Sequence, residues 1–172
     1  MSDGAGGVSD GAGGVSDGAG GAIAVGSPAA LADAVGRTAT SDWFEITQER
    51  IAAFADATED HQWIHLDAEK AAAGPFGSTI AHGYLTLSLL SHLASPLVSL
   101  GGAAMVMNYG LDRLRFLAPV PAGSRVRART EILSAEPTSR GVRLACEVTV
   151  EIEGSAKPAL VAHTLSLYVP DD

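Results

Sequence analysis

Two side chains suited to proton transfer stand five positions apart in the segment from Phe54 to Leu90. Asp60 offers a carboxylate, and His65 offers an imidazole whose ordinary pKa of about 6.5 lets it accept or donate a proton near neutral pH. A carboxylate beside an imidazole fixes the ring tautomer and prepares both groups for acid/base catalysis. The spacing therefore predicts an acid/base pair, and it leaves open which member takes the first proton.

The residues around this pair resemble the hydratase motif of the MaoC-like dehydratases, hot-dog proteins related to R-specific enoyl-CoA hydratases. That motif is usually written S/T-G/E-D-x-N-P-I/L-H-x-D, followed by F-x-x-x-I/V-A/V-H-G. The chain reads TEDHQWIHLD over residues 58–67, and Phe76 precedes IAHG at residues 80–83. The departure is Gln62-Trp63 in place of the commoner Asn-Pro, at a position that concerns the pocket wall more than the pair.

The resemblance implies reversible hydration of trans-2-enoyl thioesters, or dehydration of (R)-3-hydroxyacyl thioesters, carried on coenzyme A or acyl carrier protein. Hydration needs a base for water, an acid for the carbon beside the carbonyl, and a donor aimed at the enolate oxygen. Asp60 and His65 can supply the first two. The resemblance assigns the third to the backbone N–H of Gly83, which opens an apolar helix and has no intrahelical partner there.

Other residues are expected to line the pocket or to support the pair. His82 is expected to begin the helix with a structural hydrogen bond, whereas Trp63 and Tyr84 fit pocket or core packing. Ser91 lies two turns after Gly83, where it holds a buried carboxylate or is simply a satisfied core serine. The full set expected at the substrate is Trp63, Ile64, His82, Tyr84, Ser91, Asn108 and Arg115.

Three other interpretations compete with hydration. A metal site is conceivable because His61 and His65 are four apart, but the run lacks the Glu of H-E-x-x-H and a clear third ligand, so no metal or cofactor is expected. A hot-dog thioesterase would use a carboxylate at the thioester carbonyl, and the retained His65 argues against it. A non-catalytic acyl-binding subunit of a heterodimeric dehydratase would lack the pair that this chain has.

Periodicity and turn signals predict an α+β hot-dog fold, in which a curved antiparallel sheet wraps a long central helix. Ser27 and Pro28 begin a short helix that ends at Gly36, and Thr47 and Asp67 cap two more. Pro119 to Gly123, Glu136-Pro137 and residues 153–155 are expected turns. The expected helices are 48–57, 68–73 and the apolar 79–95, and the expected strands are 42–46, 105–116, 124–133, 141–152 and 159–169.

Composition favours one domain with a flexible N-terminal tail. The chain has 172 residues, of which 47% are hydrophobic, enough for a real core. Residues 1–25 repeat SDGAGGV with little to bury and are expected to form a flexible tail, leaving residues 26–172 as the domain. A half-open sheet with an edge strand commonly closes by pairing two copies, so a homodimer is expected.

Charge and cysteine content bound the partners and the compartment. A net charge of −9 argues against nucleic acid or an anionic membrane as the main partner. Arg125, Arg127 and Arg129 alternate as on the solvated face of a strand, although they also lie in a basic stretch that could meet an anionic ligand. The lone Cys146 is expected to be buried and suits a reducing cytoplasm, and no secretory leader is expected.

Overall fold

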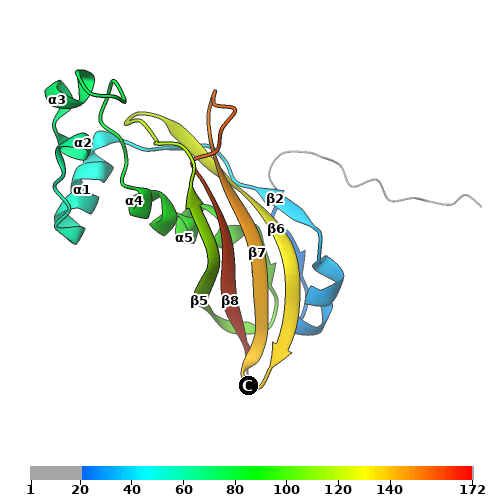
Figure 1. Ribbon diagram of the computed structural model, residues 1–172. Coiled ribbons are helices and arrows are strands. Elements are labelled where there is room, and N and C mark those ends of the chain that lie inside the picture. Colours follow the sequence, from blue (N-terminus) through cyan, green and yellow to red (C-terminus); the bar gives the residue numbers. More distant parts are fainter. Residues whose placement is uncertain (1–20, 172) are drawn as a thin grey trace, which may run out of the picture.

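The computed structural model describes residues 21–171, and its body is a curved antiparallel sheet. The strands β6 (Arg125–Thr138), β7 (Gly141–Ile152), β8 (Leu160–Pro170) and β5 (Ala103–Phe116) hydrogen-bond in that order. Two short strands, β2 (Thr38–Thr40) and β3 (Phe44–Glu45), both pair with β6 and complete six strands. Figure 1 shows β5 at the edge of this sheet, beside β8.

Alternation along the long strands creates one buried face, called here the inner face. Along β7 the buried side chains are every second residue, from Val142 to Ile152. The outer face carries the arginines of β6, where Arg127 bonds Glu151 at 2.6 Å and Arg125 bonds Glu153 at 3.0 Å. The expected burial of Cys146 and the expected solvated arginine face are both confirmed. Burial raises the pKa of the Cys146 thiol to about 12.

The predicted turn at Glu136-Pro137 is wrong, because β6 continues to Thr138 and its hairpin with β7 turns at residues 139–140. β2 covers β6 only as far as Glu131. Ile132 still bonds residues 36 and 37, and after it β6 has, within residues 21–171, a hydrogen-bonded neighbour on one side only, so a proline there need not cost a ladder hydrogen bond. The strand predicted at residues 141–152 has the same bounds in the structure.

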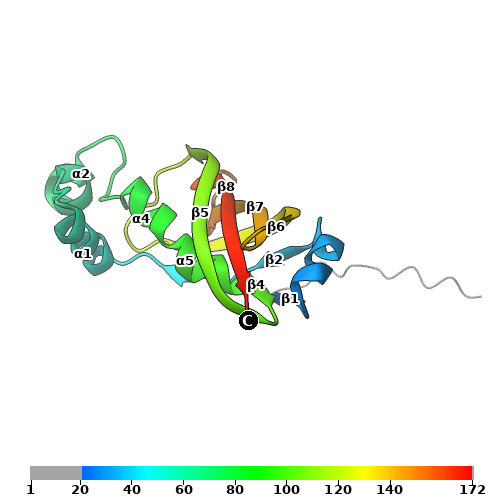
Figure 2. The same ribbon diagram turned by 90° about the horizontal axis from the view of Figure 1, so that it is seen from below.

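The predicted single helix over residues 79–95 is also wrong in extent. The structure has two short helices, α4 (Gly83–Ser88) and α5 (Leu90–Leu93), followed by the 3-10 turn η2 (Ser95–Leu97). Residues before Gly83 are extended because the Ile80 N–H bonds the Ile64 carbonyl and the Ala81 N–H bonds the Val120 carbonyl. The helices pack Leu85 and Leu90 toward the inner face, and Figure 2 shows them beside β5.

Three helices gather at the end of the sheet where α4 begins (Figure 1). They are α1 (Gln48–Thr58), α2 (Trp63–Leu66) and α3 (Ala68–Ala72). The Thr47 hydroxyl accepts a bond from the Arg50 N–H at 3.3 Å, and the Asp67 carboxylate accepts one from the Lys70 N–H at 2.9 Å. The N-caps predicted at Thr47 and Asp67 are therefore confirmed, whereas Ser27, also predicted as an N-cap, makes no side-chain cap hydrogen bond.

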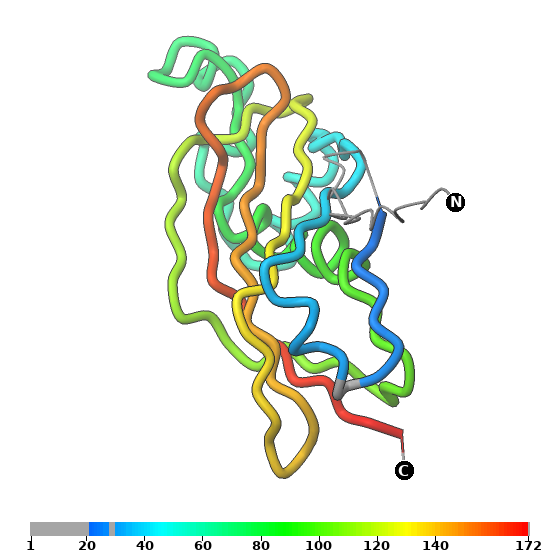
Figure 3. The backbone as a smooth tube through the Cα atoms, turned by 90° about the vertical axis from the view of Figure 1, so that its right-hand side faces the viewer, coloured from blue at the N-terminus to red at the C-terminus, as the bar shows by residue number. Residues whose placement is uncertain are grey.

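The predicted tail extends three residues too far into the fold. Residues Ile23–Val25 form β1, which pairs in parallel with β4 (Val98–Leu100), and Ile23 and Val25 are buried. Figure 3 shows these two segments side by side. The first helix is the 3-10 helix η1 (Pro28–Ala34) rather than an α-helix. The repeat itself, in residues 1–20, lies outside the described residues, and no helix within residues 21–171 is both long and apolar enough to cross a membrane.

Candidate active site

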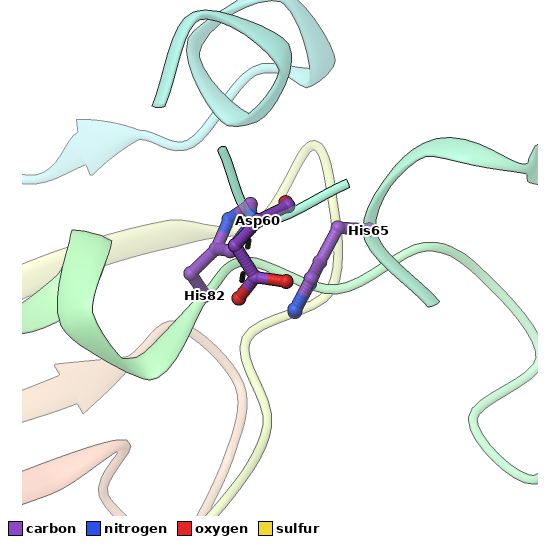
Figure 4. A group of neighbouring side chains, drawn as sticks. All are labelled: Asp60, His65 and His82. Carbon is purple, nitrogen blue, oxygen red and sulfur yellow. Dashed lines mark hydrogen bonds and ion pairs between the residues drawn. The ribbon is translucent and has the colours of Figure 1, made fainter. Parts of the chain in front are cut away.

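Three polar side chains from separate segments meet at the start of α4. Asp60 follows α1, whose end is closed by Glu59 in the left-handed conformation with φ of 59°. His65 lies in α2, and His82 is the residue before α4. One possible ligand atom from each lies within 4.8 Å of the others. Figure 4 shows the Asp60 carboxylate pointing toward the two imidazole rings.

His65 is held as a neutral ring with one free nitrogen. Its Nδ1 lies 2.7 Å from the Ile80 carbonyl oxygen. A carbonyl only accepts, so Nδ1 carries the proton and Nε2 of the neutral ring carries a lone pair. Burial lowers the pKa of His65, an effect that the bond to Ile80 opposes and the nearby His82 reinforces. A lowered pKa favours the neutral ring, in which Nε2 can accept a proton.

The Asp60 carboxylate stays accessible while its backbone is anchored. Its side chain is 56% exposed, and Oδ2 lies 4.0 Å from Nε2 of His82. That nitrogen donates to the Asp60 backbone carbonyl at 3.0 Å. Among the residues that the structure describes, no hydrogen bond joins Asp60 to His65, so the tautomer of His65 is fixed by Ile80 and not by the carboxylate.

His82 connects both members of the pair. Its ring is 3% exposed and stacks on His65 with centroids 3.7 Å apart and planes 24° apart. The ring centroid of Phe54 in α1 lies 5.1 Å from that of His82, with the two planes tilted by 55°. Because Nε2 holds the Asp60 backbone and the ring face holds His65, His82 positions the two groups relative to each other. The expected structural hydrogen bond at this helix start is present.

A short chain of hydrogen bonds fixes α2 against the extended segment before α4. Gln48 donates to the His65 carbonyl at 2.8 Å, and the Thr79 hydroxyl donates to the Gln48 side-chain oxygen at 2.5 Å. Sequence reasoning missed both residues. Gln48 carries no motif, and its only signal is a polar side chain at the first position of a helix whose cap was predicted.

A cavity of about 350 Å³ opens beside His65. Gly83 and Ile64, both expected at the site, line it. Thr86 is a buried polar residue on the same wall that the sequence did not single out, and its hydroxyl bonds the His82 carbonyl at 3.4 Å. The other lining residues are Ile80, Ala81, Phe116, Leu117, Ala118, Pro119, Val120 and Ala159.

The remaining expected residues lie elsewhere. Trp63 packs under Lys70, whose amine lies 4.7 Å from its ring centroid, and Tyr84 is 68% exposed. Arg115 points its guanidinium at the neighbouring Leu114 carbonyl. Ser91 and Asn108 line a second cavity, and Ser91 is exposed, so it does not hold a buried carboxylate.

The three side chains suit proton transfer better than metal coordination. Each ring uses one nitrogen on a backbone carbonyl, which leaves Nε2 of His65 and Nδ1 of His82 as the nitrogens that a metal could reach. The two rings also stack face to face, whereas the ligands of a tetrahedral zinc ion approach to about 2 Å from different directions. A lowered His65 pKa and an accessible carboxylate are instead the features of an acid/base site.

Comparison with known proteins shows the family to which this site belongs. The MaoC like domain matches residues 31–153. The chain is 53% identical over 145 residues to 3-hydroxyacyl-thioester dehydratase Z of Mycobacterium tuberculosis, covering 83% of this chain and 96% of that protein. It is 45% identical over 152 residues to nodulation protein N of Rhizobium leguminosarum bv. viciae, covering 84% and 91%. The chain therefore belongs to the MaoC-like dehydratase family.

Solved structures agree with this assignment. R-hydratase PhaJ1 from Pseudomonas aeruginosa superposes with a TM-score of 0.68 at 26% identity, covering 80% of this chain and 83% of that one. The (R)-hydratase from A. caviae gives 0.65 at 27% identity, covering 78% and 96%. The family, the hot-dog fold and the hydratase/dehydratase class predicted from the sequence are confirmed by these matches.

Proposed function

We propose that the protein hydrates trans-2-enoyl thioesters to (R)-3-hydroxyacyl thioesters, and catalyses the reverse dehydration, with Asp60 and His65 as its acid/base pair. The observation that carries this assignment is the contact of His65 Nδ1 with the Ile80 carbonyl, which leaves Nε2 without a hydrogen-bond partner in residues 21–171, on the wall of the cavity that Gly83 also lines. A carboxylate oxygen of Asp60 lies within 4.8 Å of a ring nitrogen of His65 and of a ring nitrogen of His82.

The chemistry follows from these positions. One member of the pair takes a proton from water as the hydroxyl oxygen bonds to C3 of the enoyl group, and the pair returns a proton to C2. Negative charge develops on the thioester oxygen in between. The Gly83 N–H stands at the first position of α4, where it has no intrahelical partner, and we assign it to that oxygen. One such donor contributes about 3 kcal/mol to acyl chemistry.

The substrate is an acyl thioester on coenzyme A or acyl carrier protein, and the enzyme acts as a homodimer. Within residues 21–171 the long strand β5 has a hydrogen-bonded neighbour on one side only, β8, so its other edge can pair with a second copy. The buried, lone cysteine fits a reducing compartment, and we assign the enzyme to the cytoplasm on that ground.

The direct test is a hydration assay on crotonyl-CoA that follows loss of the conjugated double bond and determines the chirality of the product. Asp60→Asn and His65→Gln are each expected to lower turnover about 100-fold or more, the scale of general acid/base catalysis. His61→Gln is a matched control, because His61 is exposed in the same segment and bonds Asp56 instead. Release of free thiol without hydration would identify a thioesterase.

A further inference from the structure

A second cavity, of about 650 Å³, lies between α4–α5 and the inner face of the sheet. Its lining shares no residue with that of the cavity beside His65, but the two linings follow one another along α4 and along β5. On α4, Thr86 lines the His65 cavity and Leu87 lines the second one, and β5 likewise gives Phe116 to the first and Leu111 to the second. A chain that enters at His65 and follows α4 therefore arrives in the second cavity.

The sheet wall of this second cavity is polar, and it runs from the exposed Asn108 on β5 to the buried Thr130 on β6. Asn108 of β5 and Ser166 of β8 stand directly opposite each other in the register, and both line the cavity. Thr164 continues this wall on β8 beside Cys146. Two serines of the facing helical segment, Ser91 and Ser95, line it from the other side.

Thr130 adds a buried hydroxyl that has no partner. It lies on β6 among Val126, Ala128 and Ile132, which are apolar and buried. Its side chain lines the cavity, the residue is 2% exposed, and Oγ1 has no hydrogen-bond partner among the described residues. Buried hydroxyls in folded proteins are nearly always hydrogen-bonded, so this one is open to a water molecule or to a polar group that enters the cavity.

The cavity carries no charge to match a charged ligand. Serine, threonine, asparagine and tyrosine supply its polar groups, and none of the described residues that line it is acidic, basic or histidine. A carboxylate or an ammonium group placed there would be desolvated without a countercharge. A hydroxyl or a carbonyl group needs only one or two of the hydrogen bonds that these side chains can make.

We infer that the second cavity receives the far part of the acyl chain, and that the preferred substrates carry a neutral hydroxyl or carbonyl group there. This inference rests on the proposed hydration of enoyl thioesters and specifies its substrate class. The thioester end stays at Gly83, the chain passes Thr86, and the polar group hydrogen-bonds on the Thr130, Thr164 and Ser166 wall.

The test compares straight-chain trans-2-enoyl-CoA thioesters of increasing length with a matched series that carries a terminal hydroxyl. At one chain length the hydroxylated substrate is expected to have a kcat/KM about tenfold above its plain counterpart, the order that one or two neutral hydrogen bonds of about 1 kcal/mol each provide. Replacing the hydroxyls by Thr130→Val together with Ser166→Ala is expected to bring that ratio close to one.

Thr149→Val is the matched control, because Thr149 lies on β7 with its side chain away from this cavity, and it should keep the wild-type ratio. Plain chains favoured at every length would overturn the inference, as would a preference that survives the double variant. The wild-type comparison decides the matter even if the double variant does not fold. Failure to hydrate crotonyl-CoA would instead overturn the proposed function itself.

Discussion

At the scale of single residues, the position of the proton on each imidazole decides what the site can do. The Nδ1–H of His65 donates a hydrogen bond to the Ile80 carbonyl, and Nε2 keeps a lone pair. The Nε2–H of His82 donates a hydrogen bond to the Asp60 backbone carbonyl. Nδ1 of His82 is buried and has no partner among the described residues. The His82 ring thus acts as a support, and the ring that lines the cavity, His65, is the one we propose as a member of the acid/base pair.

His82→Phe separates the two contacts of this support. Phenylalanine can keep a ring against His65 but cannot donate to the Asp60 carbonyl, a bond worth about 1 kcal/mol. We expect kcat to fall roughly fivefold to tenfold with little change in KM, and the pH profile of kcat/KM to move to higher pH because His82 helps to lower the pKa of His65. Steady-state kinetics across pH measures both effects. Unchanged kcat and an unchanged profile would mean that His82 only fills space.

The lowered pKa of His65 makes both rate and stability depend on pH in a defined direction. Burial is its main cause, so the folded protein binds this proton less readily than the unfolded chain, whose histidine has a pKa near 6.5. Stability from this group is complete above about pH 6.5 and is lost as pH falls through the folded pKa. Urea unfolding should show that the free energy of unfolding falls more between about pH 7.5 and about pH 5.5 in the wild type than in His65→Gln. An equal fall in both proteins would contradict the assignment of this pH dependence to His65.

At this scale the sequence pointed to Asp60 and His65 and to a structural hydrogen bond at His82, but not to the partners of these groups. Asp60 and His65 stand in a local motif, so their spacing and the family resemblance together brought them forward. The contacts of His65 with Ile80 and of His82 with Asp60 join residues 15 and 22 positions apart. They depend on how the extended segment before α4 folds back on α2, which a local pattern does not contain.

At the scale of elements, the start of α4 sets the geometry of the site. Ile80 and Ala81 are held extended by bonds to Ile64 and Val120, so the helix can begin only at Gly83. The apolar residues from 79 onward predicted a single helix through Ser95. This was wrong because hydrophobicity indicates burial but does not show which backbone groups bond to other segments. Pro96 then favours an end to regular helix before it.

Gly83→Ala tests the role of this helix start. A Cβ at Gly83 would lie 3.2 Å from three ring atoms of Phe116, inside the cavity that His65 lines. Alanine is the better helix former by about 1 kcal/mol, so the fold should survive while kcat/KM falls about tenfold. Gly26→Ala is the control, because a Cβ there meets nothing within 4 Å. Full activity in a folded Gly83→Ala protein would place the oxyanion donor elsewhere.

The strands were predicted well where alternation was long and poorly where elements were short. β7 alternates buried and half-exposed residues over its whole length, and its bounds follow from that pattern. β1 and β4 have three residues each and pair in parallel across about 75 positions of sequence. Three residues give too little periodicity to separate a strand from the end of a tail.

At the scale of the whole molecule, the two edges of the sheet are unequal. One edge is formed by β2 and β3, which have three and two residues, and such short edges rarely pair with other chains. The other edge is β5, which has 14 residues and exposes Met105, Val106, Met107, Tyr109 and Leu111. A long apolar edge of this kind favours pairing with another copy of the same strand.

The homodimer proposed on this basis can be broken at the edge strand without touching His65. Tyr109 is 53% exposed near the middle of β5, and Tyr109→Lys places like charges on two strands that would face each other across a twofold axis. We expect the molar mass from light scattering to fall from that of two chains to that of one. Leu133→Lys, which charges an exposed apolar residue of β6 away from this edge, should leave the mass of two chains unchanged. A Tyr109→Lys protein that remains a dimer, or a wild type that is a monomer, would show that β5 does not join the subunits.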